Sequence, residues 1–422
     1  MSLKERAAKV VSPVLAMYTD LEIECGRGMY IITSNGDKYL DFSSGIAVVN
    51  TGHCHPKVVE AIKKQSGELI HACIGIGYYA SYIEVCEKLK DISPTGLDVS
   101  FLCQSGTEAV EGALKLAKYV TGKQGIIAFK GGFHGRSLGA LSVTTSKEKF
   151  RKPYEPLLPN VYIAPYAYCH RCTLVKQGDN FAPKCKYECL KQTENIIKKA
   201  GAKKIAAMIV EAIQGENGYV IPPKAFISGL RKLCDKYKIL MIADEVQTGF
   251  GRTGKMFAIE HFNVVPDIMT MSKAIASGMP LGAVIAKKEI MSKWSPGSHG
   301  GTLGGNPVAC KACIATIEVL QKEKLVQNAD KLSKFLNGKL KNLAAHYDEL
   351  ISDVRSIGLA AAVEFRDSQN VSKVLKLCLD HKLILMSGGE FGQSVRFAPP
   401  LIVTKSQLDT AMILFESALR SL

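Results

Sequence analysis

The sequence contains no apolar run that approaches the roughly 18 residues needed to span a bilayer. It also lacks internal repeats and low-complexity tracts, which excludes solenoids and fibrous arrays. Near the start, a short apolar stretch is interrupted by Pro13 and no convincing cleavage site follows, so we expect no secretory signal. With 422 residues, 47% of them hydrophobic and 22% charged, the chain is expected to be a soluble, cytoplasmic protein of two or three folded units, with no membrane partner.

Acidic residues are scarce relative to basic ones, since 39 Asp and Glu stand against 54 Lys and Arg and leave a net charge of +15. A surface of this sign can bind nucleic acid through its phosphates. The lysines are spread along the chain, however, and no nucleic-acid motif accompanies them. We therefore favour a Lys-rich exterior that attracts anionic small molecules, with no nucleic-acid partner. A salt-sensitive gel shift with bulk DNA or RNA distinguishes the two interpretations.

The 13 cysteines are an odd number, and most of them lie in apolar patterns that suit small buried side chains in a reducing compartment. Four are different, because they form a C-x2-C pair followed, twelve residues on, by a C-x3-C pair in a polar, proline-containing stretch. These are Cys169, Cys172, Cys185 and Cys189. Four thiolates at such spacings can close a tetrahedral site, which predicts a structural zinc ion without a catalytic role. Four reduced thiols in a surface insertion, or one or two disulfides, are the alternative.

Short apolar runs alternate with longer amphipathic ones from about residue 98 to residue 290. Continuous apolar runs bounded by turn residues are typical of strands buried on both faces. Their alternation with helices predicts an α/β fold with a mostly parallel, doubly wound sheet. The runs are Val99–Cys103, Ile126–Phe129, Ile205–Val210, Ile239–Ala243, Ile268–Met271 and Leu281–Ile285.

The pattern changes after Gly305. Asn306 followed by Pro307 predicts a helix start, and the remainder mixes helices with short strands such as Ala360–Phe365. Near the other end of the chain, an Asn35-Gly36 turn between two short apolar runs predicts a hairpin. We therefore expect a large domain over residues 51–305 and a small α+β domain over 306–422. The N-terminal segment, residues 1–50, is expected to pack with the small domain.

Polar residues stand directly after several of the predicted strands. Asp244 and Lys273 each follow one, and ligands of open α/β sheets bind beyond the carboxyl ends of the strands, so both should face the same crevice. After another strand, Ser105 and Glu108 have the spacing of a capping box, and Gly106 opens the helix start to a phosphate. An amine for a Schiff base, a carboxylate for a pyridine nitrogen and a phosphate cradle are what pyridoxal phosphate (PLP) chemistry requires.

The sequence resembles the class III aminotransferases, which are fold-type-I PLP enzymes, from about residue 41 to about residue 400. The motifs that carry the resemblance are Ser105–Glu111, Phe133–Arg136, Asp244–Gly254, Ser272-Lys273 and Gly301–Pro307. Within the class, the stretch Gly45–His53 is most similar to the 4-aminobutyrate (GABA) aminotransferases, and it contains a substrate-binding candidate, Ile46. The resemblance implies a homodimer with active sites at the subunit interface.

The resemblance also implies roles for matching positions. Lys273 would hold the cofactor as a Schiff base and carry the proton, Asp244 would pair with the ring nitrogen, and Gln247 would bond the ring hydroxyl. The remaining cofactor contacts would be Gly106 and Thr107 at the phosphate, Phe133, His134 and Val246 around the ring, and Thr302 from the neighbouring subunit.

Two arginines are candidates for binding the substrate, because a planar guanidinium binds carboxylates in a fork. In the ω-aminotransferases that the chain resembles, the counterpart of Arg136 takes the distal carboxylate. The counterpart of Arg396 takes the α-carboxylate of 2-oxoglutarate, and a glutamate masks it while an ω-amine is bound. Glu211 occupies the place of that glutamate, although Ala212 and Asn217 stand where the family usually has proline and glycine.

These residues predict a PLP-dependent ω-aminotransferase with a ping-pong mechanism. It would move an amino group from a 4-aminobutyrate-like donor to 2-oxoglutarate and give a semialdehyde and glutamate. Acetylornithine or ornithine transamination and amino-acid racemisation are the alternatives within the class. A racemase needs no carboxylate clamp for an acceptor, so the presence of both Arg136 and Arg396 favours a transaminase.

Overall fold

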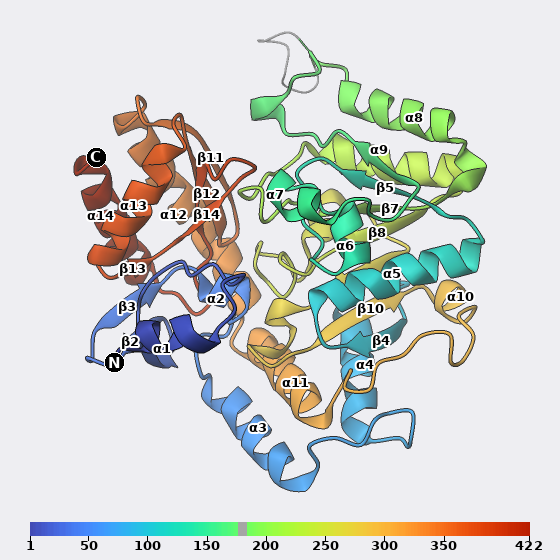
Figure 1. The fold of residues 1–422 in the computed structure, drawn as a ribbon, viewed down its shortest axis with the longest axis horizontal. Coiled ribbons are helices and arrows are strands. Elements are labelled where there is room, and N and C mark those ends of the chain that lie inside the picture. The colour runs from blue at the N-terminus through green and yellow to red at the C-terminus, as the bar shows by residue number, and fades with distance from the viewer. Residues whose placement is uncertain (176–183) are drawn as a thin grey trace.

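A computed structural model describes residues 1–175 and 184–422, and its strands form three sheets (Figure 1). The central sheet has the strand order β4-β10-β9-β8-β7-β5-β6. Its strands are β4 (Val99–Cys103), β5 (Gly125–Phe129), β6 (Val161–Ala164), β7 (Ile205–Val210), β8 (Leu240–Asp244), β9 (Ile268–Met271) and β10 (Gly282–Ala286). β10 runs antiparallel to both of its neighbours, β4 and β9, and the other neighbouring strands pair parallel. The predicted α/β class, with a mostly parallel sheet, is confirmed, while β6 was not among the predicted strands.

Alternate residues of the central strands enter two hydrophobic cores on opposite faces of the sheet. Ile126 and Ala128 of β5 belong to the core covered by α5 (Gly106–Thr121) and α6 (Leu138–Val143). Ile127 and Phe129 belong to the other core. That core is covered by α4 (Ala80–Ile92), α8 (Glu188–Ala200), α9 (Lys224–Tyr237) and α11 (Pro307–Lys322). Because both faces are buried, each strand is a continuous apolar run in the sequence.

The predicted hairpin is present, since β2 (Tyr30–Thr33) and β3 (Lys38–Asp41) pair antiparallel around the Asn35-Gly36 turn. Together with β1 (Ile23–Arg27) they form a sheet that a C-terminal strand, β13 (Leu383–Ile384), completes by pairing parallel with β3. Figure 1 shows these blue strands beside the red C-terminal elements. Chain segments more than 300 residues apart therefore share one sheet.

The third sheet contains β11 (Ile351–Ile357), β12 (Ala360–Phe365), β14 (Met386–Gly388) and β15 (Ser394–Phe397). Its helices are α12 (Leu325–His346), α13 (Gln369–Asp380) and α14 (Lys405–Arg420). Across the sheet, Arg355 pairs with Ala362, which pairs with Arg396. Cross-strand partners project from the same face, so the two arginines point to the same side.

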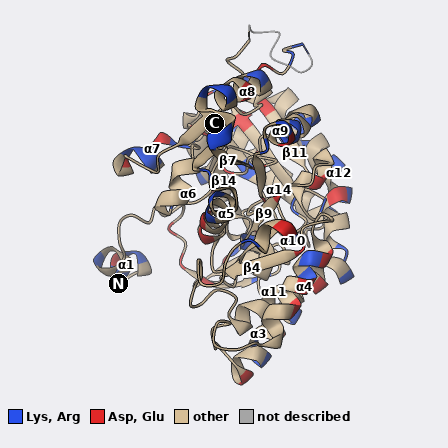
Figure 2. Ribbon diagram, turned by 90° about the vertical axis from the view of Figure 1, so that its right-hand side faces the viewer, with Lys and Arg blue, Asp and Glu red and all other residues tan. Residues whose placement is uncertain are grey.

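Basic residues are distributed over many elements of the chain. Figure 2 shows Lys and Arg on α1 (Leu3–Val10), α3 (Pro56–Glu68), α7 (Glu148–Arg151), α8 and α12, with acidic residues among them. Some of these charges are paired, as Glu194 of α8 is with Lys198 and with Lys236 of α9. Within the described ranges, no helix is both long and apolar enough to cross a membrane.

Arg252 connects three parts of the chain through hydrogen bonds. Its side chain is fully buried, and its guanidinium donates to the carbonyl oxygens of Leu359 (3.0 Å) and Pro399. It also donates to Oδ1 of Asn50 at 2.6 Å. Burial lowers the pKa of Arg252 to about 10. The residue thus stabilises the contact between the segment around residue 50, the β11–β12 turn and the chain after β15.

We expect Arg252→Met to lower the free energy of unfolding by about 3 kcal/mol or more, since each buried acceptor left without a donor costs ~1–3 kcal/mol. The measurement is chemical denaturation followed by circular dichroism. Arg366→Met is the matched control, because Arg366 is exposed and donates to a single carbonyl, that of Asp348. Equal loss of stability in the two variants would contradict the connecting role of Arg252.

Candidate functional site

A cavity of about 230 Å³ lies at the carboxyl-terminal edge of the central sheet, and every residue that lines it follows a strand. The strands that supply these residues run in one direction, so their ends meet at this edge. The lining residues are Gly106 and Thr107 after β4, Phe133, His134 and Gly135 after β5, Glu211 after β7, Asp244, Val246 and Gln247 at the end of β8, and Lys273 after β9. Nine predicted site residues are therefore brought together.

Asp244 is the last residue of β8, and both oxygens of its buried carboxylate have hydrogen-bond partners. Oδ2 lies 2.7 Å from Nδ1 of His134, while Oδ1 accepts from the backbone N–H of Val246 (3.0 Å) and the hydroxyl of Thr270 (3.2 Å). Burial would lower the pKa of His134, but the Asp244 carboxylate outweighs it and raises that pKa. These hydrogen bonds therefore fix the orientation of the Asp244 carboxylate at the cavity.

Lys273 follows β9 in a left-handed backbone conformation, with φ of 49°. Such a conformation is strained for a residue with a side chain, and strain of this kind gathers at functional sites. Enclosure in the cavity and the nearby charge of Arg396 lower the pKa of Lys273 to about 8. At pH 7 roughly one amine in ten is then neutral, far more than for an ordinary lysine, and the neutral amine is the nucleophile.

The N-terminus of the 16-residue helix α5 forms one end of the cavity. Ser105 Oγ accepts from the Glu108 backbone N–H at 3.3 Å, but the Glu108 carboxylate accepts from Gln104, so only half of the predicted capping box is present. A Cβ at Gly106 would lie 2.8 Å from Cγ1 of Val246. The helix start therefore needs glycine here, and its free N–H groups can hold an anion.

Glu211 does not mask Arg396 as the sequence indicated. Its carboxylate accepts from the backbone N–H groups of Phe133 (2.9 Å) and Gly215 (2.8 Å), which fixes the cavity wall. Burial raises the pKa of Glu211 to about 7. The strand end points this glutamate at backbone donors of its own loop, so it has no oxygen directed at the arginine.

The carboxylate that pairs with Arg396 belongs to Glu216, five residues further along the same loop. Glu216 Oε2 lies 2.9 Å from Nη2 of Arg396, whose side chain is only 1% exposed. Nη1 of Arg396 reaches Oε1 of Gln247 at 3.3 Å, and Gln247 lines the cavity. The arginine is thus beside the cavity and neutralised by a neighbour that could move.

The other predicted substrate residues lie outside the cavity lining. Arg136 is exposed, and its guanidinium lies 4.3 Å from the ring centroid of Phe150. The Phe150 ring in turn packs edge-on against Phe133 at 6.0 Å. Ile46 is 42% exposed and belongs to a short turn, α2 (Ser44–Ala47), in which all four residues have positive φ. Thr302 is exposed and does not contribute to the cavity of its own chain.

The predicted structural zinc ion is not supported. All four cysteines line one small cavity, yet among residues 1–175 and 184–422 no group of three or more His, Cys, Asp or Glu is arranged to hold a metal ion. Cys189 is buried in α8, and burial raises the pKa of its thiol to about 12. Residues 176–183, between the two cysteine pairs, lie outside the described ranges.

Comparison with known proteins finds similarity over nearly the whole chain. The class-III aminotransferase family matches residues 13–419. The acetylornithine aminotransferase of Archaeoglobus fulgidus is 38% identical, with 94% of this chain and 96% of that protein covered. A probable 4-aminobutyrate aminotransferase of Bacillus subtilis is 34% identical, with 94% and 92% covered.

Two further matches bear on the chemistry and the fold. The alanine/serine racemase of Pyrococcus horikoshii is 38% identical over 99% of this chain and 90% of that protein. The crystal structure of an (S)-enantioselective omega-transaminase from Thermomicrobium roseum superposes with a TM-score of 0.91 at 28% identity, covering 100% of this chain and 99% of that one. The fold is therefore shared over both chains.

The lowered pKa of Lys273 is directly testable in the cofactor-free protein. We expect labelling of Lys273 by an amine-reactive reagent to reach half its maximum near pH 8, because the neutral amine reacts. An ordinary lysine titrates near ~10.4. Peptide mass spectrometry over a pH series measures this. Arg396→Met should move the midpoint upward, since it removes a like charge, and an unchanged midpoint would contradict that electrostatic contribution.

Proposed function

The chain belongs to the class-III aminotransferases, and we propose that it transfers an amino group from an ω-amino acid of the 4-aminobutyrate type to 2-oxoglutarate. The observation that supports this proposal is the ion pair between Arg396 and Glu216 beside the cavity. While the pair is closed, Arg396 is not available to an α-carboxylate, so a donor with a terminal amine is favoured. When the pair opens, Arg396 can bind the α-carboxylate of a 2-oxo acid.

The cavity residues fit the PLP cofactor that this family uses. The start of α5 offers N–H groups to a phosphate, and Phe133 and Val246 line the space between that end and Asp244. When bound, PLP supplies an electron sink for the reacting carbon. We propose that Asp244 binds the ring nitrogen, Gln247 the ring hydroxyl, and Lys273 Nζ holds the cofactor covalently and then moves the proton.

We propose that Arg136 binds the distal carboxylate of the substrate. It is exposed, and its guanidinium packs over the ring of Phe150, which in turn packs edge-on against Phe133 of the cavity wall. Ile46 would form an apolar wall for the methylene groups. Its turn is held by Asp41, which accepts from the N–H groups of Ser43 (2.7 Å) and Ser44 (3.1 Å).

We propose that the enzyme acts as a homodimer. Large apolar side chains gather on the segment that precedes α4, where Ile70 is 65%, Ile76 87% and Tyr78 93% exposed. Such a surface is typical of protein interfaces. A second subunit would cover it and would bring its own Thr302 to the phosphate end of the cavity.

A panel of amine donors tests the proposed function. With 2-oxoglutarate as acceptor, we expect glutamate to form fastest with 4-aminobutyrate or 5-aminovalerate, because Glu216 neutralises Arg396 in the donor-binding state. N-acetylornithine and ornithine are included because an acetylornithine aminotransferase is 38% identical to this chain, against 34% for the 4-aminobutyrate aminotransferase. Exchange of the α-hydrogen of alanine without any acceptor, and no glutamate from any amine, would indicate a racemase instead.

The donor preference should depend on Glu216. We expect Glu216→Gln to raise kcat/KM for α-amino acid donors relative to ω-amines by about tenfold or more, because it removes one partner of a buried charge pair. Glu148→Gln is the control, since Glu148 is exposed and pairs with Lys152 at 3.5 Å. If Glu211→Gln changed the ratio and Glu216→Gln did not, the sequence-based assignment would stand.

A further inference from the structure

The two carboxylate oxygens of Glu216 have different partners. Oε2 lies 2.9 Å from Arg396 Nη2, and Oε1 accepts from Lys147 Nζ at 3.1 Å. The side chains of Lys147 and Glu216 are each only 15% exposed. Burial would raise the pKa of Glu216, but the charges of Arg396 and Lys147 outweigh it and hold that pKa below its usual range. An ionised carboxylate is therefore shared between two cations in a mostly water-free place.

The backbone of the turn that carries Glu216 is fixed at three successive points. The carbonyl of Gly215 accepts from Arg396 Nη1 at 3.3 Å, and that of Glu216 accepts from the Gly389 N–H at 2.9 Å. The carbonyl of Gly218 accepts from Arg355 Nε at 2.9 Å. Since a Cβ at Gly218 would lie 3.0 Å from Arg355 Nη2, the turn also packs directly on that arginine.

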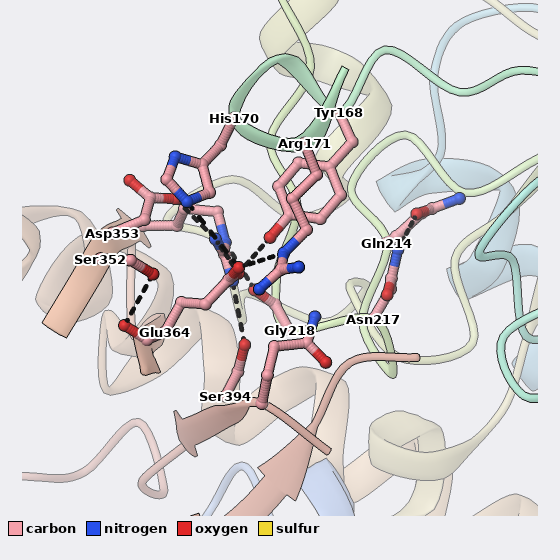
Figure 3. A network of polar contacts seen from close by, with 12 residues as sticks. Tyr168, His170, Arg171, Gln214, Asn217, Gly218, Ser352, Asp353, Glu364 and Ser394 are labelled. Carbon is pink, nitrogen blue, oxygen red and sulfur yellow. Dashed lines mark hydrogen bonds and ion pairs between the residues drawn. The ribbon is translucent and has the colours of Figure 1, made fainter. Parts of the chain in front are cut away.

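Arg355 is itself held in a network that joins β11 and β12 to the segment after β6 (Figure 3). Its Nη1 donates to Glu364 at 2.8 Å. Glu364 is fully buried and also accepts from Tyr168 and Arg171. The backbone of the turn is thus anchored, so the motion that frees Arg396 must be a rotation of the Glu216 side chain.

Lys147 emerges from an equally fixed segment. The Thr145 N–H donates to the Gly132 carbonyl at 2.7 Å, and its hydroxyl donates to the Phe129 carbonyl at 2.7 Å. Thr144 accepts from the His134 N–H at 2.9 Å. The backbone just before Lys147 is therefore fixed to the loop after β5.

We propose that Lys147 is a specificity-determining residue that retains the Glu216 carboxylate when the α-carboxylate of the acceptor takes Arg396. This inference rests on the proposed function. With Lys147 present, the contact between Glu216 and Arg396 breaks and two separate ion pairs result. Glu216 stays paired with Lys147, and Arg396 pairs with the acceptor. Without Lys147, the displaced carboxylate would be nearly buried and unpaired, which disfavours the open state. Lys147 would thus set the affinity for the acceptor and leave the closed, donor-binding state intact.

The test separates the two half-reactions of the holoenzyme by the change in cofactor absorbance. We expect Lys147→Met to lower kcat/KM for 2-oxoglutarate by about tenfold or more, with the ω-amine half-reaction changed by less than about twofold. Lys147→Arg should retain acceptor use. Lys149→Met is the matched control, because Lys149 is exposed and two residues away. Its amine lies 5.8 Å from the ring centroid of Phe150, and that of Lys147 lies 5.7 Å from the same centroid.

A binding measurement checks the inference without turnover. Glutarate carries two carboxylates and no reacting group, so calorimetric titration of the holoenzyme should show weaker glutarate binding in Lys147→Met and recovery in Lys147→Met/Glu216→Gln. Continued weak binding in the double variant would mean that Lys147 binds the ligand itself, and equal loss in both half-reactions would mean a merely structural role. Either result overturns the inference, as does wild-type protein that binds no glutarate. A wild-type protein that binds glutarate but accepts no ω-amine overturns only the proposed function.

Discussion

The organisation of this protein depends on the burial of charged side chains at one edge of the central sheet. Six strands end there, and the residues at and after their ends bring an amine and three carboxylates close together, beside the guanidinium of Arg396 from β15. A charge removed from water is stable only with a partner, so each group constrains its neighbours. His134 orients Asp244, and Arg396 both neutralises Glu216 and lowers the pKa of Lys273. Chemistry and stability are therefore set by the same contacts.

That constraint also explains how distant parts of the chain are joined. The cavity lies on the central sheet, but Arg396 is on β15 of the third sheet. The site is therefore complete only when the third sheet packs against the loops of the central sheet. Arg252 secures this contact by donating to the carbonyl oxygens of Leu359 and Pro399, and Arg355 does so by donating to the Gly218 carbonyl and the Glu364 carboxylate. These hydrogen bonds thus surround the ion pair of Arg396 and Glu216. In that pair, a substrate carboxylate can replace the carboxylate of Glu216.

The features that follow from local sequence were predictable. Strands buried on both faces give apolar runs, and the parallel direction then places Asp244, Lys273 and Gly106 at one edge. The short strand β6 was not among the predicted strands, although its residues Val161–Ala164 form an apolar run as long as Ile126–Phe129. The cysteine spacing predicted zinc because spacing carries no information on burial, and the burial of Cys189 in α8 is a tertiary effect.

The partner of Arg396 shows what could not be predicted from local sequence, because it is Glu216 and not Glu211. Glu211 follows β7 directly, and the resemblance to the ω-aminotransferases assigned it to Arg396. The end of a strand fixes only where a loop begins, whereas the loop then turns at Gly215 and Gly218 and presents Glu216 to the third sheet. Lys147 had no sequence signal at all, since its pairing joins residues 69 positions apart across a fold that must already exist. A carboxylate held between two cations can leave one of them at low cost, and so the contacts least visible in the sequence would govern which substrate the enzyme accepts.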